Sequence, residues 1–129
     1  MSCLRSINLS RSRFLSHTGL SNLVVNCQYL VEIDLSGVTK LTDLGALAIS
    51  KASNLEKLWL AVCRLITDVG IGYIADGCRK LKLIDLRWCL GVGDLGVGLI
   101  AVKCEEIRSL YLSYVNVSLI FAQTLSLSC

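Results

Sequence analysis

The sequence predicts an α/β solenoid, in which parallel strands line the concave side and helices line the convex side. Two observations predict it. An apolar–polar–apolar triplet recurs five times at a spacing close to 26 residues. Three of the triplets are followed, at a constant distance, by an Asp-x-Gly step and a stretch with helical apolar spacing. Self-similarity of this length is typical of stacked units that share one continuous core.

Each triplet is predicted to form a short strand, because its alternation buries one face of an extended chain. The triplets begin at residues 7, 33, 58, 84 and 110, so their spacing is 26, 25, 26 and 26 residues. They are Ile7-Asn8-Leu9, Ile33-Asp34-Leu35, Leu58-Trp59-Leu60, Ile84-Asp85-Leu86 and Leu110-Tyr111-Leu112. This gives four full units and a fifth strand, about four to five repeats in all.

An acidic residue opens each of three predicted helices. These residues are Asp43, Asp68 and Asp94. We expect each to cap its own helix and to contribute about 1 kcal/mol, because an Asp oxygen accepts from the free N–H groups of the first turn. His17 stands at the same place in the first unit and is expected to be a substituted cap. The glycine two positions later is expected to permit close packing, and two of the helices should end near Cys78 and Cys104.

The cysteines are predicted to be structural. Cys63 and Cys89 follow the start of a triplet by five residues, and Cys27, Cys78 and Cys104 follow one by twenty. A thiol fits a tight corner and can donate weakly to a loop carbonyl. The chain has no C-x-x-C pair and a single histidine, so neither a zinc site nor a Cys–His catalytic pair is supported. Seven cysteines without a secretion signal indicate reduced thiols.

Composition excludes several classes of protein. Hydrophobic residues make up 53% of the chain and charged residues 18%, which excludes disorder. The Lys and Arg residues are scattered, with only Arg11 and Arg13 close together, so we expect no nucleic-acid partner. No apolar run approaches the roughly 18 residues of a membrane helix, and the N-terminus lacks the apolar core of a signal peptide. We expect a cytoplasmic or nuclear protein without a cofactor or a membrane partner.

A longer pattern connects these features. Residues 78–104, CRKLKLIDLRWCLGVGDLGVGLIAVKC, follow C-x-x-L-x-x-L-x-L-x-x-C-x-x-[IL]-T-D-x-G-[IL]-x-x-[IL]-A-x-x-C closely, and residues 54–78 follow it without the leading Cys. The pattern resembles the cysteine-containing subclass of leucine-rich repeats, which is characteristic of F-box/LRR-repeat proteins. Residues 54–115 are similar to the plant F-box/LRR-repeat protein 3 group, and the resemblance covers roughly residues 1–115.

The resemblance implies a substrate receptor of an SCF ubiquitin ligase, acting in ubiquitin-dependent proteasomal degradation. In such receptors an F-box binds a Skp-type adaptor and the repeat arc captures the protein to be ubiquitinated, while another enzyme performs the transfer. Here no F-box is present and Met1 falls inside a unit. The repeat pattern stops after Tyr114, and Ile120 replaces the acidic residue in a divergent tail, residues 116–129. We therefore expect residues 1–115 to be a fragment of a receptor arc, with the adaptor bound only by a longer form.

The outward positions of the predicted strands are candidates for contact with a protein substrate. An exposed group of Trp, Tyr and Arg has the composition of an interface hot spot. The candidates are Trp59, Asp85, Arg87, Trp88, Tyr111 and Tyr114. Trp59, Asp85 and Tyr111 should be near neighbours, because adjacent strands lie about 4.8 Å apart. The scaffold does not explain Trp59 or Trp88, whose positions are expected to tolerate any residue. Alternatively, the aromatic side chains pack on each other or on loop edges.

Other functions are less well supported by the sequence. A generic repeat adaptor or a decoy would use the same surface without a role in ubiquitination. An F-box encoded in frame upstream of Met1 would exclude this alternative. An enzyme lacks support, because no Gly-rich phosphate loop, G-x-S-x-G motif or metal-ligand spacing is present. A small-molecule sensor would need a longer arc to close a pocket.

The ends of the predicted stack should make the isolated chain self-associate. Neither end carries a polar capping repeat, so apolar core is expected to be exposed there. Size-exclusion chromatography with light scattering should show oligomers or poor recovery, and a stable monomer would contradict this expectation.

Overall fold

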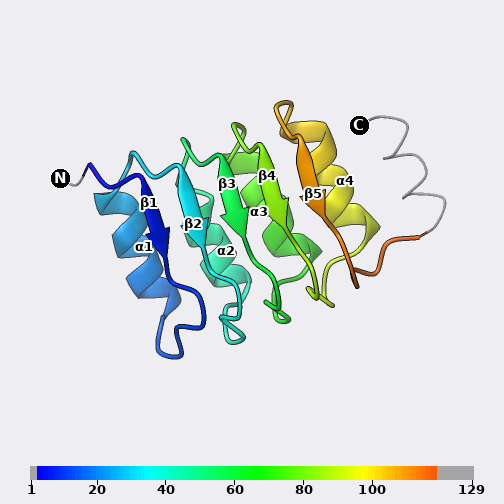
Figure 1. Ribbon diagram of the computed structural model, residues 1–129, viewed down its shortest axis with the longest axis horizontal. Helices are drawn as coiled ribbons and strands as arrows, with labels where there is room; N and C mark the ends of the chain where they lie inside the picture. Colours follow the sequence, from blue (N-terminus) through cyan, green and yellow to red (C-terminus); the bar gives the residue numbers. More distant parts are fainter. Residues whose placement is uncertain (1–2, 119–129) are drawn as a thin grey trace.

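The computed structural model describes residues 3–118, in which five parallel strands alternate with four helices (Figure 1). The strands are β1 (Ser6–Asn8), β2 (Glu32–Asp34), β3 (Lys57–Trp59), β4 (Leu83–Asp85) and β5 (Ser109–Tyr111). The helices are α1 (His17–Asn26), α2 (Asp43–Ile49), α3 (Asp68–Gly77) and α4 (Asp94–Lys103). The predictions about Met1 and Ile120 concern residues outside the described part.

The strands form one sheet in the order β1-β2-β3-β4-β5, so every strand pairs with its neighbours in the sequence. The register places the first residues of the five predicted triplets opposite one another, Ile7 with Ile33, then Leu58, Ile84 and Leu110. This confirms the predicted alignment. Each strand begins one residue before its triplet, and the last triplet residue continues the pairing beyond the strand, as when Leu9 N–H donates to the Asp34 carbonyl at 2.8 Å.

All four helices lie on one side of the sheet (Figure 1). The inward strand residues Ile33, Leu58 and Ile84 are completely buried against helix residues such as Ile49 and Ile74. Ile7 and Leu110, in the two outer strands, are only partly buried, so the core is most complete in the middle of the sheet. No helix within residues 3–118 is long and apolar enough to cross a membrane.

The predicted helix caps are wrong in detail. The capping residues are Thr42 and Thr67, whose hydroxyl oxygens accept from Leu44 and Val69 N–H at 3.3 and 3.2 Å. Asp43, Asp68 and Asp94 are instead the first residues of their helices. Ser16 caps α1, so His17 is not a substituted cap either.

Three acidic side chains connect the second, third and fourth units to the unit that follows. Asp43 Oδ1 accepts from Thr67 N–H at 2.9 Å, and its Oδ2 accepts from the Thr67 hydroxyl at 2.6 Å. In the same way Asp94 Oδ1 accepts from Ser118 N–H at 2.8 Å. The carboxylates therefore fix the start of the following unit, which explains their regular spacing.

Asp68 also replaces a missing cap. The residue before α4 is Gly93, which has no side chain to offer to the first turn. Asp68 Oδ1 accepts from both Gly93 and Gly96 N–H, at 2.8 and 3.0 Å. A Cβ atom at Gly96 would lie 2.6 Å from Asp68 Oδ1, so glycine permits this approach and the predicted close packing.

The chain turns sharply after each strand through a residue with positive φ. These residues are Arg11, Gly37, Val62, Trp88 and Tyr114, with φ between 61° and 77°. The N–H groups of the first four then donate to a carbonyl of the next unit at 2.8 to 3.0 Å, which extends the parallel pairing. Only glycine adopts this conformation without cost, and a β-branched residue such as Val62 is rare there. Arg, Gly, Val, Trp and Tyr all occupy this turn position, so the positive φ alone does not explain why Trp88 stands there.

Replacing Asp68 by Ala should lower the free energy of unfolding by about 2 kcal/mol, since two backbone donors lose a charged acceptor. Asp68→Asn, which keeps one carbonyl oxygen, should lose about half as much. Urea unfolding followed by circular dichroism measures both. Glu105→Ala, which removes an exposed carboxylate from the turn after α4, is the control and should have a much smaller effect. Equal losses for Asp68→Ala and Glu105→Ala would contradict the bridging role.

Candidate functional site

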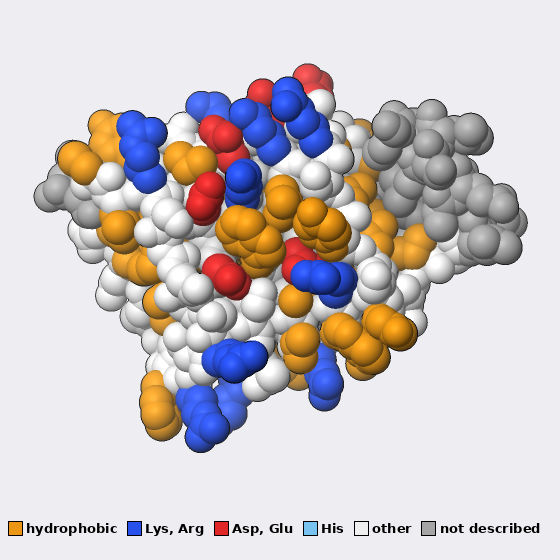
Figure 2. All heavy atoms as spheres, viewed as in Figure 1, with side chains coloured by type: hydrophobic (Ala, Val, Ile, Leu, Met, Phe, Trp, Pro, Cys, Tyr) orange, Lys and Arg blue, Asp and Glu red, His pale blue; other side chains and the backbone are white. Residues whose placement is uncertain are grey.

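The outward side chains of the five strands, with the residues that immediately follow each strand, form a surface that we call the strand face. Figure 2 views the molecule from this side and shows hydrophobic side chains gathered near its centre, with charged side chains of both signs around them. Trp59, Asp85 and Tyr111 occupy equivalent positions on β3, β4 and β5 and pair in register, as predicted. The strand face therefore carries the predicted aromatic group at its centre.

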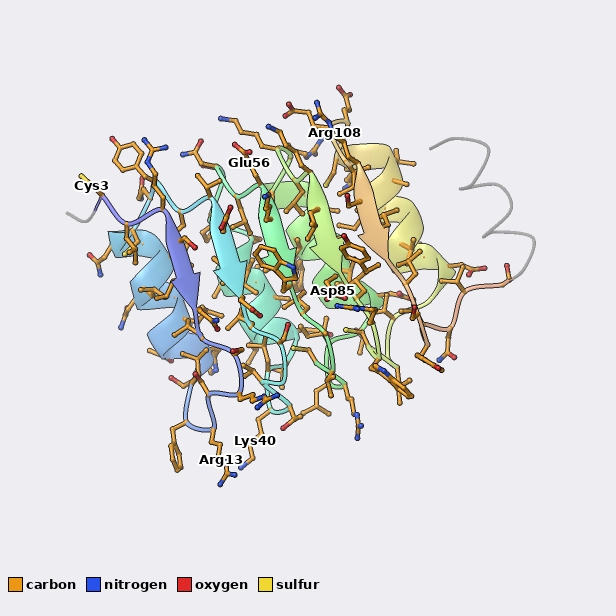
Figure 3. All side chains as sticks on the ribbon, in the orientation of Figure 1. Cys3, Arg13, Lys40, Glu56, Asp85 and Arg108 are labelled. Carbon is orange, nitrogen blue, oxygen red and sulfur yellow. The ribbon has the colours of Figure 1, made fainter. Side chains whose placement is uncertain are left out.

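Asp85 lies beneath this surface rather than on it. Its side chain is only 1% exposed, and Figure 3 shows the residue in the middle of the sheet. Asp85 Oδ1 accepts from the backbone N–H and the Nε–H of Arg87, both at 3.0 Å, and its Oδ2 accepts from Arg87 Nη2 at 2.8 Å. The expectation that Asp85 contacts a partner directly is corrected: its carboxylate is fully engaged in holding Arg87.

Arg87 presents its guanidinium group in a fixed position. Its side chain is 51% exposed, and its guanidinium carbon lies 5.4 Å from the centre of the Tyr111 ring, a cation–π contact. The hydrogen bonds and charge of Asp85 raise the pKa of Arg87 above its ordinary value. Tyr111, on β5, is 43% exposed, and Trp59, on β3 at the opposite side of β4, is half-buried. We call Trp59, Arg87 and Tyr111 the central cluster.

Trp88 and Tyr114 form a second aromatic group at the turns that follow β4 and β5. Their rings stack with centroids 4.0 Å apart and an angle of 12° between the planes. The alternative interpretation, that aromatics pack on each other, is therefore correct for this pair. Both nevertheless remain accessible, with 43% and 65% of their surface exposed. The pair extends the aromatic surface of the central cluster toward the loop edge of the sheet.

The cysteine columns are buried, as predicted. The Sγ atoms of Cys63, Cys78 and Cys89 donate to carbonyls of the preceding unit, at 3.3, 3.4 and 3.0 Å. Cys104 Sγ donates to the Cys78 carbonyl at 3.4 Å. Burial raises the pKa of Cys63 and Cys78 to about 12 and that of Cys89 and Cys104 to about 11. These neutral thiols fill corners between units and add weak hydrogen bonds.

The part of the chain that the structure describes contains no group of three or more His, Cys, Asp or Glu side chains placed to hold a metal ion. The sequence matches no model of a known protein family. The chemistry of the strand face, which combines aromatic rings with a fixed cation, is therefore the main guide to function.

Sequence reasoning identified the aromatic positions but missed two features. It did not reveal that Arg87 folds back over Asp85, although an Asp and an Arg two residues apart on one face of a strand are close enough to pair. It also missed a basic group formed by Arg11, Arg13 and Lys40. The signal was present, because residues 13 and 40 lie about one repeat apart in the sequence.

The buried thiols should resist alkylation in the folded chain. At pH 8 a thiol with a pKa of about 11 is ionised in roughly one molecule in a thousand, and the thiolate is the nucleophile. Iodoacetamide followed by peptide mass spectrometry should label the exposed Cys3 within minutes and leave Cys63, Cys78, Cys89 and Cys104 unlabelled until guanidinium is added. Rapid labelling of these four in the native chain would contradict their role as core residues.

Proposed function

We propose that this chain is a leucine-rich repeat solenoid that binds another protein on its strand face. Three observations support the proposal: the in-register parallel strands, the helices confined to one side, and the regular bridges between successive units. Because each unit contacts mainly its neighbours, such a stack leaves the outward strand positions free to carry a binding surface. In this arrangement the strand face would be concave.

The observation that carries the proposal is the central cluster. The Arg87 guanidinium group donates two hydrogen bonds to Asp85 and lies over Tyr111, with Trp59 on the other side of Asp85. A side chain that is already fixed loses little conformational entropy on binding, so more of the contact energy appears as affinity. Trp, Tyr and Arg are also the residues most enriched at protein-binding hot spots.

Within this proposal, the chain acts as the substrate-capturing arc of an SCF-type ubiquitin ligase receptor. The support is the cysteine-containing repeat pattern of residues 54–104, whose cysteines occupy the buried corners between units. The chain would select the protein to be ubiquitinated, partner enzymes would perform the transfer, and a Skp-type adaptor would join through an F-box in a longer form. A generic adaptor would use the same face. The turnover of the captured proteins distinguishes a generic adaptor from a ubiquitin ligase receptor.

Immobilised full-length chain should capture a defined set of proteins from a plant extract through the central cluster. Trp59→Ala combined with Tyr111→Ala should reduce capture at least ten-fold by quantitative mass spectrometry, because truncating a hot-spot residue costs about 2 kcal/mol or more. Leu95→Ala combined with Val102→Ala, which truncates two exposed side chains of α4, is the matched control and should leave capture unchanged. Equal capture by wild type and the Trp59/Tyr111 variant would refute strand-face binding.

The ubiquitin role has its own readout. Proteins captured through the central cluster should accumulate when the proteasome is inhibited in the cells from which the extract is made. They should also accumulate when the chain is overproduced alone, because it would compete with the complete receptor. Captured proteins whose abundance responds to neither treatment would favour the generic adaptor.

A further inference from the structure

We propose that a basic pocket beside the strand face binds a phosphorylated side chain of a partner protein. The pocket lies between the loop that joins β1 to α1 and the loop that joins β2 to α2. The inference rests on the proposed function in one respect: the ligand is part of a protein that the chain binds. It is separate from the central cluster, which lies over β3, β4 and β5.

The pocket has a volume of about 310 Å³ and is built by two successive units. Its lining residues are Arg11, Ser12, Arg13, Phe14, Gly37, Thr39 and Lys40. Figure 3 shows Arg13 and Lys40 projecting from neighbouring loops at the same corner of the molecule. Figure 2 shows that basic side chains gather at this corner without acidic ones between them. The volume is at the lower end of the range of small-ligand pockets and suits a single side chain.

The three cations of the pocket have no opposing charge. No acidic residue lines it, and within residues 3–118 the side chains of Arg11, Arg13 and Lys40 form no ion pair. Some bases elsewhere are neutralised, since Lys57 pairs with Glu32 and Lys82 with Glu56. The positive potential of the pocket is therefore available to an anionic ligand.

Arg11 is held in the pocket by the backbone of the second unit. Gly37 has φ +77°, and a Cβ atom there would lie 3.1 Å from Arg11 Cγ. The absence of a side chain at Gly37 thus leaves room for the aliphatic part of Arg11 to pack across the gap between the two units. Arg11 N–H also donates to the Ser36 carbonyl at 2.8 Å, which fixes the start of this side chain.

A phosphate group matches this lining better than a carboxylate. It carries up to two negative charges and three strong acceptor oxygens, whereas a carboxylate carries one charge and two oxygens. Arginine forms paired hydrogen bonds with phosphate, and lysine adds a point charge. The hydroxyl groups of Ser12 and Thr39 supply further donors.

The neighbouring surface favours a protein segment over a nucleic acid. A second pocket of about 370 Å³ shares Arg11 and Gly37 with the first and continues past Asp34 and Ser36 to Val62. A nucleic acid that followed this path would place further phosphates near Asp34, which repels them. A peptide needs only one phosphate, and the rest of its chain can follow the groove toward the central cluster.

Retention of the full-length chain on immobilised peptide libraries tests the proposal. One library has a central phosphoserine flanked by three random residues on each side, and two others carry serine or glutamate at the centre. The phosphoserine library should retain at least five times more chain than either of the others at pH 7.5. Retention should fall as the pH is lowered from 7.5 to 5, because the second phosphate pKa is about 6 and the dianion is lost.

Removing the pocket cations should abolish this preference. Arg11→Ala, Arg13→Ala and Lys40→Ala together should reduce the phosphoserine-to-serine ratio to near one. Arg5→Ala, Lys51→Ala and Arg108→Ala remove the same number of charges from exposed positions outside the pocket and should preserve the ratio. Circular dichroism verifies that both triple variants are folded. If the pocket variant does not fold, the double variant Arg13→Ala with Lys40→Ala replaces it, because it leaves the tightly packed Arg11 in place.

Three results would overturn the inference: equal retention on the phosphoserine and glutamate libraries, a ratio that survives in the pocket variant, or stronger binding of a 20-nucleotide RNA that the same cations control. The Trp59/Tyr111 variant separates this inference from the proposed function. The phosphoserine-to-serine retention ratio of this variant should match that of wild type, even if the variant no longer captures proteins from the extract. If the wild-type chain showed no preference for phosphoserine over serine but still captured proteins through the central cluster, only the pocket proposal would be refuted.

Discussion

The hydrogen bond from an acidic side chain of one unit to the backbone of the next is the constraint on which the fold depends. Asp43, Asp68 and Asp94 each reach across about one repeat to N–H groups at or before the start of the following helix or loop. The strands are only three residues long, although backbone hydrogen bonds on either side of them, such as those from Leu9 and Arg11 N–H, extend the pairing between units. The carboxylate bridges and the thiols of Cys63 and Cys89 connect units at the edge of the sheet where the strands end. The thiols of Cys78 and Cys104 connect units at the opposite edge, where the strands begin.

This spacing determines what the strand face presents. Because the units are in register, outward positions from different units form continuous columns, and Trp59, Asp85 and Tyr111 lie in one of them. Asp85 is buried and orients Arg87, so the column combines two aromatic rings with one fixed cation. The turn residues with positive φ form a parallel column that carries the Trp88–Tyr114 stack at one end and Arg11 at the other. The two candidate sites are thus separated along the sheet by the same periodicity that builds it.

Most of the fold could be predicted from the sequence, because a repeated apolar triplet specifies both the strand and its neighbour. The ends of α3 and α4 and the burial of the five cysteines were also accessible from the repeat columns. The partner of Asp68 was not. An Asp at a helix start is compatible with capping its own helix, and only the three-dimensional stack shows that the N–H groups of Gly93 and Gly96 in the next unit donate to it. Similarly, the burial of Asp85 depends on the conformation of Arg87, which the spacing of residue types does not specify.

Hydrogen exchange at the start of α4 tests the central constraint most directly. Gly93 and Gly96 donate to Asp68, whereas Leu95, between them in the same first turn, has no such acceptor. The account predicts that nuclear magnetic resonance will show the Gly93 and Gly96 amides of the native chain exchanging at least a hundred times more slowly than Leu95, relative to their unfolded rates. Exchange of all three at similar rates would show that the carboxylate of one unit does not hold the next.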